Sequence, residues 1–477
     1  MKTLSGLIIV LAMASGMATS SLFSPAESSS GSAQEATAQS EPSSPLIVHE
    51  WGTFTTFSGS NGVHLDFRPL LDHELPYFVM DRAEQAGTIW LGKGRIRSRV
   101  RMETPVTYFY TDVERTVTAR VRFPKGMLTE FYPPVREMAP AYDLNAATRG
   151  DGEPIADGLL DWGAIQLIPA SSLRPGVKDP KAAEWLQEVM ASRILPEANG
   201  NHYALARETD SAFVYSRWPG VDLPEWIETP SQSPSGAVKY RPGHHIEKFL
   251  FYRGVGQFDV PVQVTTDDKD RVAIANKGSH PISGMLLLTV NGDQLRMVQV
   301  PDCATGDTQT VVLPKEPIGM DELRIAMIER LVAAGLFEKE ATAMVNTWQD
   351  SWFTEQGTRL FYLVPQQTTD ALLPLEISPV PDKTVRVMVG RVEIMSATQE
   401  QQLMAVLKRS AQDRKVAWAK AAEEKSPVAP TLPVPVEFIT LGRMAEPALA
   451  RLQAIAKQRE VADEAELLLN QLRGENR

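Results

Sequence analysis

Alternating and aromatic runs between proline and glycine residues dominate the first half of the chain and predict strands. Short apolar runs bounded by turn-forming residues are typical of β-structure. We predict a β-rich N-terminal domain at 46–255, with strands at 47–57, 95–110, 113–123, 163–168, 213–215 and 244–253. A helix is predicted at 180–192, where Ala183, Leu186, Val189 and Met190 recur at helical spacing.

The next segment is a series of five short apolar runs separated by polar or glycine-containing turns. They lie at 260–264, 271–275, 285–290, 295–300 and 308–313. Several short strands at this spacing are typical of a small immunoglobulin-like β-sandwich. We therefore predict such a sandwich domain at 256–314.

A mixed α/β segment is predicted at 315–425. Helical periodicity at 321–334 and 338–348 is interrupted by Gly335, which suits a left-handed helix stop and predicts a helical hairpin. Strand patterns return at 358–364 and 384–395. Ser396 with Gln399 then forms a capping box that opens a long helix to about residue 424.

Four prolines mark the boundary of the last segment. Pro427, Pro430, Pro433 and Pro435 predict a stiff linker at 426–436, because proline fixes its own backbone angle. Helical periodicity at 441–472 defines a tail at 437–477, and the run Leu-Gly-Arg-Met-Ala-Glu-Pro-Ala-Leu at 441–449 is similar to the start of a HEAT-type repeat. A single repeat cannot bury its apolar face alone, so the tail must dock on the body or on a partner. The predicted fold class is mainly β, multidomain and sandwich-like, with an inserted helical hairpin and a C-terminal helical tail.

The N-terminus has the three-part pattern of a secretory signal. Lys2 precedes an apolar run at 7–14, and small residues follow from Gly16 to Ala18. We predict a signal peptide at 1–18 and a disordered spacer at 19–45, where Ser, Ala, Glu, Gln, Thr and Pro predominate. The run at 7–14 is shorter than the ~20 residues that span a bilayer. The mature protein is therefore expected to be periplasmic or extracellular, with no transmembrane segment.

The net charge argues against one class of partner, and the cysteine content excludes two kinds of site. The formal net charge is −11, which argues against a nucleic-acid partner bound mainly through phosphate contacts. Cys303 is the single cysteine, so neither an intramolecular disulfide nor a multi-cysteine zinc site can form.

Four runs carry a resemblance to a known family. They are His-Glu-Trp-Gly-Thr-Phe-Thr at 49–55, Met-Glu-Thr-Pro-Val-Thr-Tyr-Phe-Tyr at 102–110, Glu-Lys-Phe-Leu-Phe-Tyr-Arg-Gly at 247–254 and Asp-Ser-Trp-Phe-Thr-Glu-Gln-Gly-Thr-Arg-Leu-Phe-Tyr at 350–362. Over 49–393 the chain resembles a family of secreted bacterial proteins of unknown function. The resemblance implies export and a shared multidomain architecture, and it brings no catalytic residues with it.

A row of arginines is the first candidate site. Arg95, Arg97, Arg99 and Arg101 alternate along a predicted strand and would project from one face. Guanidinium groups bind carboxylates, sulfates and phosphates through paired hydrogen bonds, so one hypothesis is an anionic ligand. The alternative, which we favour, is that the row pairs with acidic neighbours such as Glu103 or Glu114.

Histidine–carboxylate pairs are the second candidate site. His245 and Glu247 share one face of a strand, and His49 or His73 could supply a third ligand for a divalent metal. The alternative is that each histidine is an ordinary packed or surface residue.

Two functions remain open at this point. The first is an exported, multidomain binding module of the cell envelope, whose partner is an anionic ligand or an envelope protein. The second is a hydrolase that uses a divalent metal held by His49, His73, His245 and Glu247, with the metal lowering the pKa of bound water. Neither identifies catalytic residues.

Overall fold

The computed structural model describes residues 44–67, 75–82, 98–141, 155–169, 171, 195–196, 198, 200–217, 227–229, 238–240, 244–267, 269, 271–313, 315–425 and 430–474. Residues 44–477 belong to one compact unit. The fold is mainly β with helical parts, as predicted. The predicted signal peptide, spacer residues 19–43, the helix at 180–192 and linker residues 426–429 lie outside the described residues.

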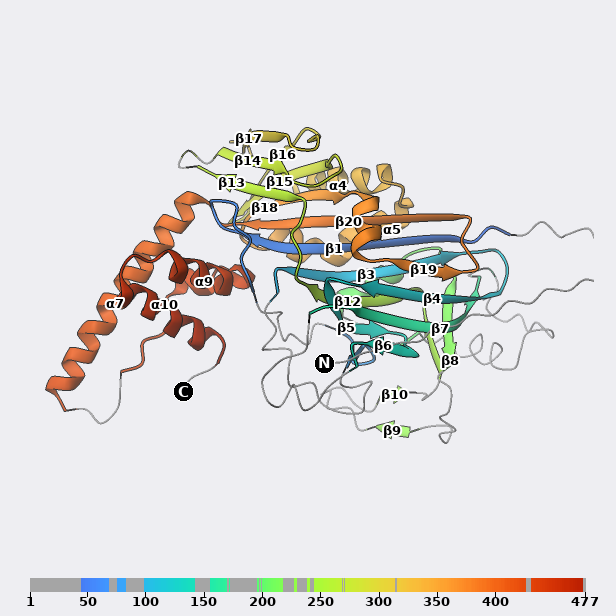
Figure 1. The fold of residues 1–477 in the computed structure, drawn as a ribbon, viewed down its shortest axis with the longest axis horizontal. Coiled ribbons are helices and arrows are strands. Elements are labelled where there is room, and N and C mark those ends of the chain that lie inside the picture. The colour runs from blue at the N-terminus through green and yellow to red at the C-terminus, as the bar shows by residue number, and fades with distance from the viewer. Residues whose placement is uncertain are drawn as a thin grey trace, which may run out of the picture. The chain divides into compact units, whose positions relative to one another are not determined.

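A nine-stranded sheet forms the centre of this unit (Figure 1). Its strands, in spatial order, are β16 (Gln294–Gln299), β15 (Ser283–Asn291), β18 (Gly357–Val364), β20 (Lys383–Ile394), β1 (Ile47–Ser58), β3 (Val100–Tyr110), β12 (Leu250–Gly256), β5 (Gly126–Tyr132) and β2 (Met80–Asp81). The central pair, β1 and β20, is parallel over its whole length, although more than 300 residues separate the two strands. The predicted N-terminal domain and the predicted mixed segment therefore contribute to the same sheet.

Three smaller sheets complete the β-structure of the described residues. A six-stranded sheet contains β11 (His244–Glu247), β8 (Phe213–Arg217), β7 (Gly158–Ile168), β4 (Arg115–Phe123), β19 (Leu375–Ser378) and β6 (Glu137–Ala139). A three-stranded sheet contains β13 (Val262–Thr266), β14 (Arg271–Asn276) and β17 (Thr308–Val312), and β9 (Ile227–Thr229) pairs with β10 (Val238–Tyr240). The predicted strand at 244–253 is thus two strands, β11 and β12, in different sheets.

The segment 256–314, predicted as an immunoglobulin-like sandwich, forms all five predicted strands and contributes them to two sheets. β13, β14 and β17 make a three-stranded sheet, while β15 pairs with β16 and also with β18 and so belongs to the nine-stranded sheet. The apolar run Met285 to Leu288 explains the position of β15 inside the larger sheet, because all four side chains are buried and a strand covered on both faces needs such a run. Turn spacing predicted the strands, and the burial of both faces of β15 accounts for its additional partner.

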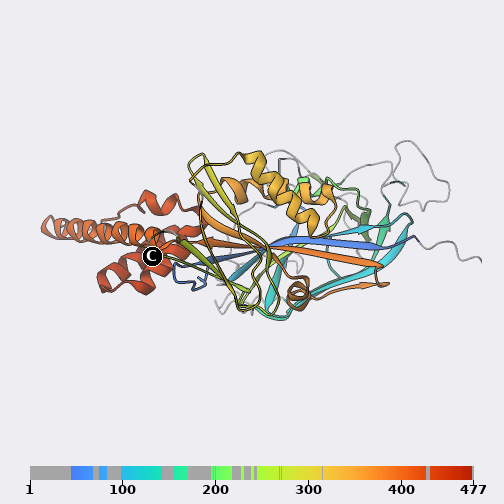
Figure 2. The ribbon, with the colours of Figure 1, turned by 90° about the horizontal axis from the view of Figure 1, so that it is seen from above.

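Both faces of the nine-stranded sheet are covered. On β1, Val48 and Phe54 pack into a core shared with the six-stranded and three-stranded sheets. Trp51 points to the opposite face and packs into a second core with the helices. We call these the strand-side core and the helix-side core. Figure 2 shows the helical hairpin on one side of the long strands.

The helical layer is η3 (His202–Arg207), α4 (Met320–Ala333), α5 (Glu338–Gln349) and the π-helix η4 (Asp350–Thr354). The short α6 (Gln366–Leu372) lies on the opposite face, where Leu372 packs against the strand-side core. The predicted hairpin of α4 and α5 is confirmed. Gly335 has φ +110°, its N–H donates to Val332 O and the Leu336 N–H donates to Leu331 O. This is the Schellman pattern that ends α4 and reverses the chain.

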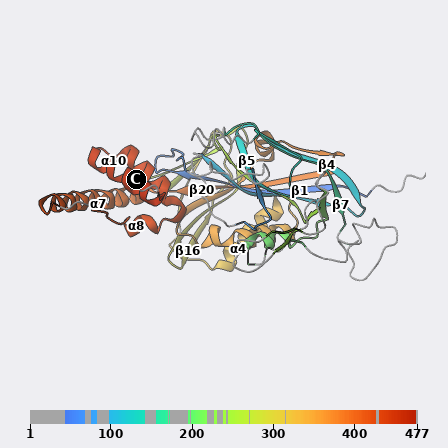
Figure 3. The same ribbon diagram turned by 90° about the horizontal axis from the view of Figure 1, so that it is seen from below.

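The C-terminal tail is helical, and it docks on the body. Its elements are α8 (Val436–Ile439), η5 (Gly442–Met444), α9 (Ala445–Ile455) and α10 (Arg459–Leu472). Together with the preceding long helix α7 (Ala397–Glu423) they lie at one end of the long strands (Figure 3). Ser396 is the N-cap of α7, and its Oγ accepts the Gln399 N–H at 3.1 Å, which is one of the two bonds of the predicted capping box. The apolar face of α9 and α10 packs on α7 and on Phe57, Leu65 and Phe67 of the body. Among the described helices, none is long and apolar enough to cross a membrane.

Candidate functional site

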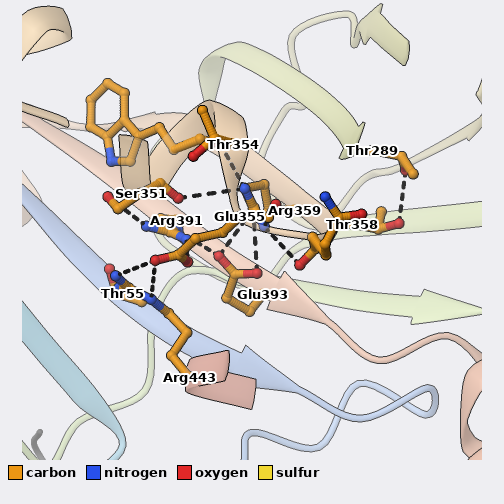
Figure 4. A network of polar contacts seen from close by, with 12 residues as sticks. Thr55, Thr289, Ser351, Thr354, Glu355, Thr358, Arg359, Arg391, Glu393 and Arg443 are labelled. Atoms are coloured by element: carbon orange, nitrogen blue, oxygen red, sulfur yellow. Dashed lines mark hydrogen bonds and ion pairs between the residues drawn. The ribbon is translucent and has the colours of Figure 1, made fainter. Parts of the chain in front are cut away.

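Seven charged side chains meet between the helix-side face of the sheet and the tail. Figure 4 labels Glu355, Arg359, Arg391, Glu393 and Arg443 among them. They come from segments that are far apart in sequence. Strand alternation places two of them on one face of β3 and two on one face of β20, and the register of β18 with β20 brings a fifth beside them. The members of this ion cluster are Arg101, Glu103, Glu355, Arg359, Arg391, Glu393 and Arg443.

The glutamates of the ion cluster each bridge two arginines. Glu103 lies 3.2 Å from Arg101 Nε and 3.1 Å from Arg443 Nη1. Glu355 lies 3.0 Å from Arg391 Nη2 and 2.8 Å from Arg443 Nη2.

Glu393 repeats this arrangement inside the sheet, 2.5 Å from Arg391 Nε and 3.1 Å from Arg359 Nε. Arg359 also donates to the carbonyls of Trp352 and Glu355 at 2.7 Å, which satisfies the C-terminal end of the π-helix. Glu355 is thereby held in position to face Arg443.

Burial and charge oppose each other at Glu103. Burial alone raises the pKa of this carboxyl, but Arg101, Arg443 and Arg391 outweigh burial and hold the pKa at about 2. The Thr55 hydroxyl donates to the same carboxylate at 2.8 Å. The pKa of Glu393 is also lowered, because Arg391 and Arg359 outweigh its burial. Both carboxyls are therefore charged at neutral pH.

A pocket of about 160 Å³ opens beside the ion cluster, between the body and the tail. The body contributes Thr55, Phe57, Phe67 and Arg101 to its wall. The tail contributes Gly442, Arg443, Ala445, Glu446, Pro447 and Leu472. Because the two walls belong to the body and the tail, the pocket exists only while the tail is docked. We call it the tail pocket.

Half of the predicted arginine row can be located. Arg99 is 42% exposed and lies 3.4 Å from Asp66 and 3.3 Å from Asp259, whereas Arg101 is buried and pairs with Glu103. The favoured alternative, pairing with acidic neighbours, therefore describes both, and Arg101 additionally lines the tail pocket. Arg95 and Arg97 lie outside the described residues.

His49 is packed against the N-terminal end of α5. Its Nδ1 lies 2.7 Å from Glu340 Oε2, and both side chains are fully buried. The Tyr110 hydroxyl donates to the other Glu340 oxygen at 2.7 Å. His49 Nε2 is buried without a hydrogen-bond partner among the described residues. The glutamate also accepts the Phe337 N–H, so the pair fastens β1 to the start of the helix.

His245 and Glu247 both point into the protein from β11, as their shared strand face predicts. Glu247 accepts hydrogen bonds from Arg207, at 2.7 Å from Nη2, and from the Tyr203 hydroxyl at 3.2 Å. His245 lies edge-on to the Tyr132 ring, with centroids 5.6 Å apart.

No group of three or more metal-ligating side chains occurs among the residues that the structure describes. His73 lies outside them. The metal site of His49, His73, His245 and Glu247 therefore stays a prediction. A metal there would have to displace Arg207 from Glu247.

The sequence interpretation missed most of the ion cluster. Arg443, Glu355, Arg391 and Glu393 have no shared local spacing, because they come from the tail, the π-helix and β20. The one local signal is Arg391 and Glu393, two residues apart in the buried part of β20. Opposite charges at that spacing in a buried strand indicate an internal ion pair.

In comparisons with known proteins, no family model and no curated protein matches the chain. Two solved structures of mu-homology domains align with it. The Fcho1 Mu homology domain from Danio rerio, with a bound Eps15 peptide, is 6% identical, with a TM-score of 0.27, over 74% of this chain and 98% of that chain. The yeast delta-COP-I mu-homology domain, complexed with a Dsl1 WxWxV peptide, is 6% identical over the same shares, with a TM-score of 0.22. Likeness at this level supports no conclusion about function.

Proposed function

We propose that this protein is an exported binding module that holds a small anionic ligand in the tail pocket. One observation carries the proposal: Arg101 and Arg443, members of a buried ion cluster, also line an open pocket. Arginine stays charged and accepts no proton at physiological pH. Its chemistry at this position therefore favours holding an anion over transferring protons.

Two carboxylates, those of Glu103 and Glu355, hold the Arg443 guanidinium in place. Burial lowers the pKa of its guanidinium, but Glu103 and Glu355 outweigh burial and raise the pKa above its ordinary value. The side chain is 12% exposed. An arginine held on two sides by carboxylates loses little conformational freedom when a ligand binds, which supports a preformed site.

Export is the second part of the proposal. It is supported by Lys2, the apolar run at 7–14 and the small residues up to Ala18. The resemblance to a family of secreted bacterial proteins agrees with it. We accordingly place the binding function in the cell envelope or outside the cell.

Thermal shift measurements with a panel of anions test the binding function. The panel contains inorganic phosphate, sulfate, acetate, benzoate and hexanoate, each at constant ionic strength. We expect at least one to raise the melting temperature of the wild type and to have less effect on Arg443→Gln. The matched control is Arg409→Gln, which removes an exposed ion pair between α7 and Glu437 of the tail. Melting temperatures that none of the five anions changes would refute the function.

Two further variants separate the tail pocket from the exposed arginine row. Arg99 and Arg101 belong to the same predicted row, but only Arg101 lines the pocket. Arg101→Gln should weaken binding of the best anion, and Arg99→Gln should leave it unchanged. Equal losses of affinity in both variants would indicate that the anion binds on the outer face of the arginine row and not in the pocket.

A further inference from the structure

Arg443 retains hydrogen-bond donors for an anion in the tail pocket. A guanidinium has five N–H groups, and three are used here: Nε and Nη2 donate to Glu355 and Nη1 donates to Glu103. One N–H on each terminal nitrogen makes no hydrogen bond to a described residue. Burying such groups without acceptors is costly. Two donors on the terminal nitrogens of a guanidinium match the two oxygens of a carboxylate.

The rest of the tail pocket is largely apolar. Phe57 and Phe67 line it from the body, and Pro447 and Leu472 line it from the tail. Its volume of about 160 Å³ is close to the ~150 Å³ of a cavity that holds benzene. The space therefore suits an apolar group of about six carbons.

We infer that the ligand of the tail pocket is a carboxylate joined to a compact apolar body of about six carbons. The carboxylate lies against Arg443, and the apolar body lies against Phe57, Phe67 and Leu472. The inference rests on the proposed function, because it specifies the ligand of the same site. It excludes inorganic phosphate and sugar-like ligands, because the apolar part of the wall cannot satisfy their additional oxygens and hydroxyl groups.

Calorimetric titration of the full mature chain tests the ligand class. Probes are hexanoate, benzoate, 1-hexanol and inorganic phosphate, together with acetate, butyrate and decanoate as a chain-length series. We expect hexanoate or benzoate to bind at least tenfold more tightly than 1-hexanol and than phosphate. Affinity should rise from acetate to hexanoate and gain nothing at decanoate, because the pocket is then full.

Arg443→Gln should reduce the preference for hexanoate over 1-hexanol to less than about threefold, while Arg409→Gln keeps it. The chain-length series needs only the wild type, so it decides the question even where Arg443→Gln fails to fold. Phosphate binding more tightly than every carboxylate would overturn the ligand class and leave anion binding standing. Equal affinity for hexanoate and 1-hexanol would overturn the role of the charge, and no binding by any probe would overturn the proposed function itself.

Discussion

Replacing Glu50 by glutamine tests how strongly a buried ion pair holds the centre of the nine-stranded sheet together. Glu50 lies on β1 and is fully buried. Arg386, on the neighbouring strand β20, donates from Nε at 2.8 Å, and its Nη2 lies 2.6 Å from the same oxygen. The hydroxyls of Tyr252 and Thr107 donate to the other oxygen. Glutamine keeps the shape and removes the charge.

The expected cost is about 3–5 kcal/mol of unfolding free energy. The Arg386 side chain is 2% exposed, so its charge is buried with the pair. Its other acid partner, Asp370, is half exposed at 2.9 Å and so is partly screened by water. The glutamine oxygen can still accept from Tyr252 and Thr107, so most of the loss comes from the unpaired guanidinium.

A double-mutant cycle measured by chemical denaturation isolates this effect. Arg386→Met alone should cost a similar amount, because it leaves the Glu50 carboxylate buried without its cation. Glu50→Gln with Arg386→Met should lie within about 2 kcal/mol of the wild type, since neither charge remains. The two single losses would then fail to add by about 3 kcal/mol or more.

The control is Lys339→Met, which breaks a pair with Asp210 in which both side chains are more than half exposed. Its cost should stay below about 1 kcal/mol. A Glu50→Gln cost in that same range, or additive single losses in the cycle, would show that water already screens the Glu50 pair and would refute the reasoning from burial.

Three further predictions follow from other parts of the chain. Exported material should have the intact mass of a chain that begins at Thr19, and a mass that retains residues 1–18 contradicts the export prediction. Glu103 has a folded pKa of about 2 against an ordinary 4.5, so its stabilisation is complete above pH 4.5 and is lost as the pH falls to 2. Its share is about 3 kcal/mol. Denaturation midpoints across this range should show a pH slope that Glu103→Gln reduces, and an unchanged slope would contradict the assignment. Limited proteolysis should cut within 19–45 and 426–435, where composition disfavours packing, yet the tail should co-elute with the body, because Arg443 and Arg451 pair with its carboxylates. Separation of the two fragments on gel filtration would show that these contacts are too weak to hold the tail.

Local sequence patterns were sufficient to predict the positions of individual strands and helices. The alternation of residues 47–57 and 384–395 predicted β1 and β20 to within about two residues. Gly335 predicted the end of α4, because its positive φ is a property of that residue and its neighbours. Ser396 and Gln399 predicted the start of α7 for the same reason. The mainly β class followed from the number of such strands.

Tertiary structure decided which elements are partners. Nothing in the run 47–58 indicates that it pairs in parallel with 383–394, and nothing in the turn spacing of 256–314 indicates that β15 also pairs with β18 outside that segment. The ion cluster depends on that pairing, because Glu103 and Arg443 are 340 residues apart. Hydrophobic periodicity is a local signal, whereas strand pairing is decided by which buried surfaces fit together once the whole chain has collapsed. The sequence by itself therefore determined the elements, and only the three-dimensional packing determined the tail pocket.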